Sequence, residues 1–117
     1  MRVYRRAGEL VLANAVLELR IATKDGINPY LLLDRRTKRK YADGDYCYGS
    51  QKEPLPELIA PPKIMKRKEG SVEVTLIGRK GPLRIEHRFR MLPESLEEQL
   101  TVTNTGDEPL DLSDKAF

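Results

Sequence analysis

Residues 83–91 read LRIEHRFRM, and residues 96–104 read LEEQLTVTN. In both stretches apolar and polar side chains alternate, a period of two that indicates β-strands with one buried face. The apolar face of the first stretch carries Leu83, Ile85, His87, Phe89 and Met91. Residues 94–100 could instead form a short helix, because Glu, Leu and Gln favour helix. The period and the Thr-Val-Thr that follows favour a strand.

The loop at 92–95 sets how these two strands would pair. Direct antiparallel pairing across this loop places Phe89 opposite Glu98. His87 and Glu98 are then diagonal neighbours on the apolar face, close enough for their side chains to meet.

The same alternation recurs at 16–21 and 71–76. Glycine-containing turns lie at 24–26, 78–82 and 105–107, where they would separate strands. The sequence therefore predicts an all-β fold, an antiparallel β-sandwich of about seven or eight strands.

The length predicts a single β-sandwich domain, or a fragment of one, over residues 1–117. Residues 54–62 hold four of the eight prolines. Because proline cannot donate a ladder hydrogen bond, this segment cannot pair fully in a sheet. We expect an extended connection along one edge, between an N-terminal group of strands and a C-terminal meander.

Charge and cysteine usage indicate where the protein works. The formal net charge is +3, and no apolar run approaches the roughly 20 residues needed to span a bilayer. The N-terminus lacks the apolar region of a signal peptide, and Cys47 has no second cysteine to pair with. We predict a cytoplasmic protein without a membrane partner.

The run RRTKRK at 35–40, with Lys66–Lys68 further on, raises the question of polyanion binding. Apolar residues before the run and Tyr41 after it predict the tip of a β-connection, where charges deter pairing with other chains. No aromatic residue within the run could stack on bases. Nucleic acid is therefore the disfavoured partner.

Few side chains fit metal or covalent chemistry. His87 and Cys47 lack the paired spacing of a zinc site, and residues 43–45 lack the remaining ligands of an EF-hand. We predict no metal and no cofactor. Neither a nucleophile elbow nor a glycine-rich phosphate loop is present in the sequence.

His87 and Glu98 are the candidate catalytic pair. A carboxylate and an imidazole on a partly buried sheet face have the groups needed to act as base and acid on a sugar hydroxyl. The alternative, which we favour, is a buried polar pair that satisfies itself for structural reasons.

Two stretches resemble known β-sandwich domains. Residues 12–21 (LANAVLELRI), 25–26 (DG) and 33–41 (LDRRTKRKY) resemble the opening of the sandwich at the N-terminus of many glycoside hydrolases. That opening contains a phrase similar to Leu-x-Asp-x-x-Thr-Gly-x-x-Tyr, and here Lys38 stands at the glycine position. Residues 100–110 (LTVTNTGDEPL) resemble a strand and turn of galactose-mutarotase-like sandwiches, a superfamily that includes sugar epimerases.

The resemblance implies a non-catalytic N-terminal β-sandwich domain of a glycoside hydrolase, part of a larger supersandwich and packed beside the catalytic domain of a longer chain. It implies carbohydrate as a ligand. The candidate platform is Tyr41, Tyr46 and Tyr48, because aromatic faces pack against sugar rings. The alternative is that these tyrosines fill a gap between the sheets.

Two other functions stay open. The first is an aldose-epimerase-like enzyme using His87 and Glu98, although His87 lacks the following glycine of the epimerase element. The second is a structural module that self-associates, with a homodimer forming through its sheet edges.

Overall fold

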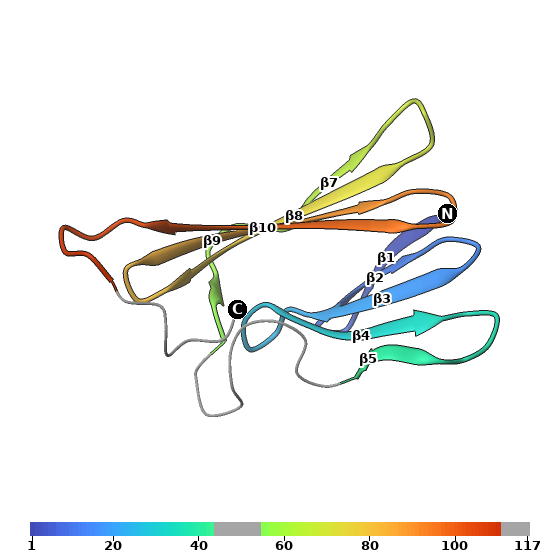
Figure 1. Ribbon diagram of the computed structural model, residues 1–117, viewed down its shortest axis with the longest axis horizontal. Helices are drawn as coiled ribbons and strands as arrows, with labels where there is room; N and C mark the ends of the chain where they lie inside the picture. The colour runs from blue at the N-terminus through green and yellow to red at the C-terminus, as the bar shows by residue number, and fades with distance from the viewer. Residues whose placement is uncertain (44–54, 111–117) are drawn as a thin grey trace.

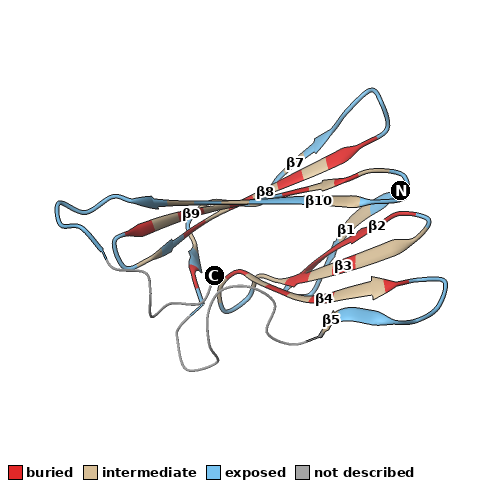
Figure 2. Ribbon diagram, in the orientation of Figure 1, coloured by how far each residue is buried: buried red, intermediate tan, exposed pale blue. Residues whose placement is uncertain are grey.

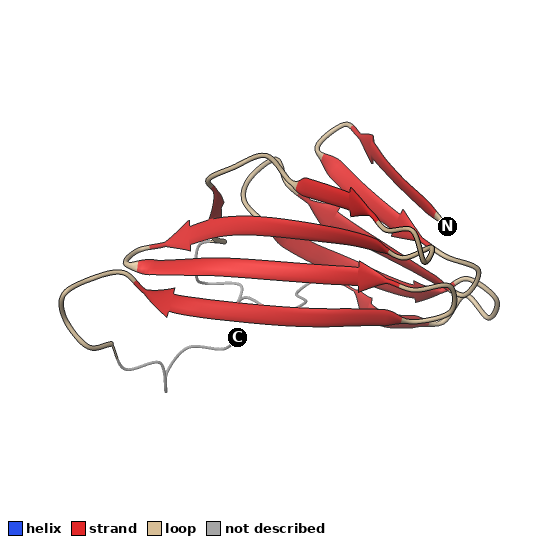
Figure 3. Ribbon diagram, turned by 90° about the horizontal axis from the view of Figure 1, so that it is seen from above, coloured by secondary structure: helices blue, strands red, loops and turns tan. Residues whose placement is uncertain are grey.

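The computed structural model of the chain describes residues 1–43 and 55–110. In these residues ten strands form two antiparallel five-stranded sheets, stacked face to face (Figure 1). Every described element is a strand or a loop (Figure 3). The expected all-β antiparallel sandwich is confirmed.

The first sheet is a meander in which each strand pairs with the next. Its strands are β1 (Arg2–Arg6), β2 (Glu9–Ala13), β3 (Leu17–Ala22), β4 (Asn28–Asp34) and β5 (Lys40–Asp43). The second sheet runs β10-β9-β8, with β6 and β7 both pairing with the far edge of β8. Its strands are β6 (Glu57–Leu58), β7 (Lys63–Lys66), β8 (Val72–Lys80), β9 (Leu83–Met91) and β10 (Leu96–Asn104).

The structure describes more strands than the seven or eight that we expected, because short edge strands show little alternation of apolar and polar residues. β6 pairs over only two residues, and it is the one paired part of 55–62. The alternating stretches were found where expected. Residues 94–100 belong to a turn and to β10, so the helix alternative is excluded.

The pairing of β9 with β10 follows the predicted register. Phe89 pairs with Glu98. The turn between them is closed by a hydrogen bond from the Leu92 amide to the Ser95 carbonyl, at 2.9 Å. Alternate residues of β8 and β9 are buried, and they face the other sheet (Figure 2).

The turn between β8 and β9 is tighter than expected. The strands continue to Lys80 and start again at Leu83, so only Gly81 and Pro82 turn the chain. Gly78, expected in the turn, lies in β8. A Cβ atom there would approach the Cδ1 of Ile27 to 2.7 Å, so the close approach of the β3–β4 turn requires glycine.

The core lies between the two sheets. It contains Leu10, Leu12, Leu19, Ile21, Ile27, Val74, Leu76, Ile85, Phe89 and Met91. β2 is buried on both faces, because outward-facing Val11 is flanked by its cross-strand partners Tyr4 and Arg20.

Asn14 connects the sheets at one end of the sandwich. Its side chain is buried, and its Oδ1 accepts the amides of Val16 and Leu17 at 2.8 and 2.6 Å, which shapes the β2–β3 turn. Its Nδ2 donates to the carbonyls of Leu92 and Ser95 at 2.7 and 3.2 Å, in the β9–β10 turn. The buried side-chain amide of Asn14 therefore makes hydrogen bonds to backbone groups in turns of both sheets.

We expect Asn14→Ala to lower the free energy of unfolding by about 2–4 kcal/mol, because it leaves buried amides and carbonyls unsatisfied. Asn104→Ala is the matched control. Asn104 makes similar bonds to Gly106 and Glu108, but it is exposed, so its loss should cost about 0.5–1 kcal/mol. Urea unfolding measures both. Equal losses would contradict the role of Asn14 between the sheets.

Candidate functional site

The expected contact between His87 and Glu98 is present. The two side chains lie on the inner face of β9 and β10, with Nε2 of His87 at 2.5 Å from Oε1 of Glu98. The imidazole also stacks on Phe89, with ring centroids 4.1 Å apart. The strand register alone therefore brings a base and an acid together.

The two side chains differ in their exposure to solvent. His87 has no exposed surface, whereas the side chain of Glu98 is 32% exposed. In this arrangement a sugar can reach the carboxylate but cannot reach the imidazole. The geometry fits a buried polar group satisfied by a carboxylate at the rim of the core.

The β4–β5 turn is built on Asp34. Its Oδ1 accepts the amides of Arg36 and Thr37 at 2.9 and 3.3 Å, and its backbone carbonyl accepts the amide of Lys38 at 2.9 Å. Lys38 has a φ of 64°, the left-handed conformation that favours glycine. The residue that departs from the resembled phrase therefore occupies the position where the backbone favours glycine.

Tyr41 lies on the surface beside this turn. Its hydroxyl donates to Oδ2 of Asp34 at 3.2 Å, and 53% of the residue is exposed. The guanidinium of Arg39 lies 5.7 Å from the ring centroid. Tyr41 does not fill the gap between the sheets. Tyr46 and Tyr48, the other expected platform residues, lie outside the described residues.

Asp34 is a stabilising carboxylate. The backbone amide of Arg36 lowers its pKa most, and although burial acts in the opposite direction, the side chain of Arg36, the amide of Thr37 and the Tyr41 hydroxyl lower it further. The ionised form is therefore the one that holds the turn.

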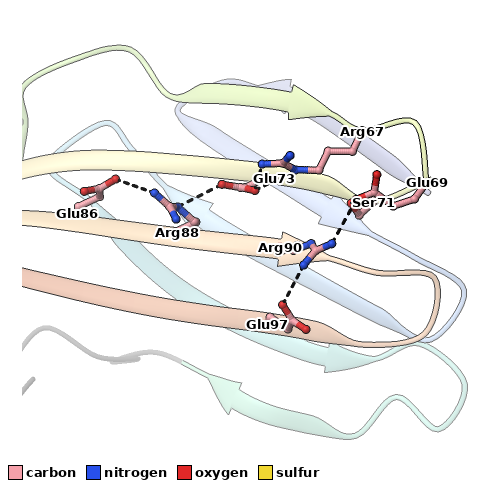
Figure 4. A network of polar contacts seen from close by, with 8 residues as sticks. All are labelled: Arg67, Glu69, Ser71, Glu73, Glu86, Arg88, Arg90 and Glu97. Atoms are coloured by element: carbon pink, nitrogen blue, oxygen red, sulfur yellow. Dashed lines mark hydrogen bonds and ion pairs between the residues drawn. The ribbon is translucent and has the colours of Figure 1, made fainter.

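The outer face of the second sheet carries an ion-pair network that we call the charged face (Figure 4). It consists of Arg67, Glu69, Ser71, Glu73, Glu86, Arg88, Arg90 and Glu97. Glu73 bridges Arg67 at 2.8 Å and Arg88 at 3.2 Å. Arg90 lies between Glu69 at 3.2 Å and Glu97 at 3.6 Å.

Each arginine of the charged face is paired with at least one carboxylate. The hydrogen bond from Arg67 lowers the pKa of Glu73, so this carboxylate stays ionised between its two arginines. Two open grooves, of about 410 and 330 Å³, lie on this face and share Glu73 and Arg88 in their linings. The alternation of Arg84, Glu86, Arg88 and Arg90 indicated an exposed charged surface, but it did not indicate these cross-strand partners.

Within residues 1–43 and 55–110, no three His, Cys, Asp or Glu side chains gather closely enough to hold a metal ion. Cys47 lies outside these ranges. In the same part of the chain, no helix has the length and apolarity needed to cross a membrane.

Comparison of the chain with protein-family models, with curated proteins and with solved structures gave no match.

We expect Asp34→Asn to flatten the pH dependence of stability in the acid range. Because the pKa of Asp34 is lowered from 3.8, its ionised form stabilises the fold above that pH, and this contribution is lost as the pH falls through the folded-state value. Urea unfolding at a series of pH values measures the effect. Asp25→Asn controls for removal of one exposed carboxylate. An unchanged slope in Asp34→Asn would contradict the prediction.

Proposed function

We propose that this chain is a non-catalytic β-sandwich module of a carbohydrate-active enzyme, a glycoside hydrolase, and that it supports the catalytic domain and contacts sugar. Tyr41 is the observation that carries the proposal. Its exposed ring ends residues 33–41, the stretch that resembles the opening of glycoside-hydrolase sandwiches.

The ring of Tyr41 is suited to a sugar because it is held before any ligand binds. Its hydroxyl is anchored to Asp34, and Asp34 is in turn anchored by the backbone of its own turn. An aromatic ring that is already oriented loses little conformational entropy when a sugar packs on its face. Tyr46 and Tyr48 follow within seven residues, and we include them in the proposed platform.

A supporting role needs a rigid body, and the inter-sheet connection through Asn14 supplies one. The charged face is a second surface suited to packing against a protein domain. Its arginines and carboxylates already neutralise one another, so covering it would bury few unpaired charges.

A second candidate function, an aldose-epimerase-like activity, is favoured by the contact between His87 and Glu98. Full burial of the imidazole argues against it. We therefore expect the chain not to accelerate mutarotation of a reducing sugar, followed by polarimetry. Acceleration that Glu98→Gln abolishes would establish the enzymatic alternative and overturn the non-catalytic assignment.

Affinity electrophoresis in gels that contain soluble polysaccharides tests the proposed function. We expect at least one polysaccharide to retard the chain, and Tyr41→Ala to weaken this binding about tenfold or more. Tyr41→Phe keeps the ring but loses the bond to Asp34 that orients it, so it should weaken binding less than Tyr41→Ala does, at a small cost in stability. Equal retardation of wild type and Tyr41→Ala would remove Tyr41 from the platform, and no retardation by any polysaccharide would refute sugar binding.

A further inference from the structure

The β4–β5 turn carries a concentrated positive charge next to Tyr41. Residues 35–40, which we call the basic tip, are all exposed, and five of these six residues are Lys or Arg. The tip projects from one end of the sandwich (Figure 1). Tyr41 therefore lies next to a local excess of positive charge.

Three cations of the tip, Arg36, Lys38 and Arg39, are compensated less than the arginines of the charged face. All three are exposed, and among the described residues the carboxylate in contact with them is Asp34, 3.5 Å from Arg36. Asp34 is only 4% exposed, and it also accepts two backbone amides and the hydroxyl of Tyr41. The carboxylate of Asp34 is used by hydrogen bonds of the turn, so it does not neutralise the exposed cations around it.

The arrangement of ring and cations indicates what would bind. The guanidinium of Arg39 lies over the Tyr41 ring, so a sugar packed against this ring would lie near that guanidinium. A carboxylate or sulfate on such a sugar can accept two parallel N–H bonds from one guanidinium, a stronger interaction than a neutral hydroxyl provides. Building on the proposed function, we propose that the basic tip and Tyr41 bind an anionic polysaccharide, whose sugar rings bear carboxylate or sulfate groups.

The extent of the charge favours a sugar acid over nucleic acid. Nucleic-acid surfaces track a backbone with a long basic stripe and several stacking aromatics. Here the basic tip is one short turn with one described aromatic ring beside it, and the arginines of the charged face are paired with carboxylates. A short, strongly cationic contact beside a ring matches a charged sugar unit.

Paired probes test the proposal on the full chain. Binding is measured by affinity electrophoresis and by titration calorimetry with dextran sulfate against dextran, and with polygalacturonate against its methyl ester. We expect the anionic member of at least one pair to bind about tenfold or more tightly than its neutral counterpart. Added salt should weaken this binding, because the polyanion releases counterions when it meets the tip.

Two charge variants locate the binding. Arg36→Gln with Arg39→Gln should weaken anionic binding about tenfold. Lys66→Gln with Lys68→Gln removes equal charge from the β7–β8 turn and should change binding less than threefold. Lys38→Gly adds an internal check on folding. It removes a cation and relieves a positive φ, so it should raise the melting temperature while it weakens binding.

The outcomes separate the two proposals. Equal binding of anionic and neutral polymers, with Tyr41 required, would overturn the anionic inference and leave the proposed function standing. No binding to any polysaccharide would overturn both. Equal weakening by the two double variants, or tighter binding to single-stranded DNA than to either anionic polysaccharide, would show general polyanion attraction and overturn the inference.

Discussion

Alternate burial along β9 is the constraint on which the rest of the structure depends. A slip of one residue would turn Arg84, Glu86, Arg88 and Arg90 into the core and expose Phe89. Burying unpaired charges costs far more than the pairing of two strands provides, so one register is fixed. That register has two consequences. It brings Glu98 against His87 on the inner face, and on the outer face it sets Arg90 opposite Glu73 of β8 and Glu97 of β10.

The polar residues in the two resembled stretches maintain turns. Asn14 satisfies the β2–β3 turn and reaches the other sheet, Asp34 caps the β4–β5 turn, and Asn104 closes the turn after β10. Asn and Asp side chains suit this task because their short side chains can accept nearby backbone amides. In this chain these polar residues therefore serve the turns of the fold.

The sequence predicted what depends on local periodicity. The alternation at 83–91 and 96–104 was enough for the sandwich class, for the β9–β10 register and for the contact of Glu98 with His87. It did not predict β6, because the two paired residues of this strand show no alternation. It also did not predict the contacts of Asn14, because its partners at 92–95 are distant in sequence. Nor did it predict the exposure of Tyr41 or the bond of Tyr41 to Asp34, because periodicity does not show side-chain contacts.

The arginines on two surfaces of this sandwich differ in how fully neighbouring carboxylates compensate their charge. On the charged face each arginine has a carboxylate partner across or along the sheet, which keeps a polar sheet face soluble without attracting anions. At the β4–β5 turn Asp34, the carboxylate in contact with Arg36, is occupied by the turn itself. Lys38 even occupies a positive-φ position, where a side chain costs roughly 1 kcal/mol relative to glycine. A strained residue that adds charge where glycine would add stability is more readily explained by what the turn binds than by how it folds.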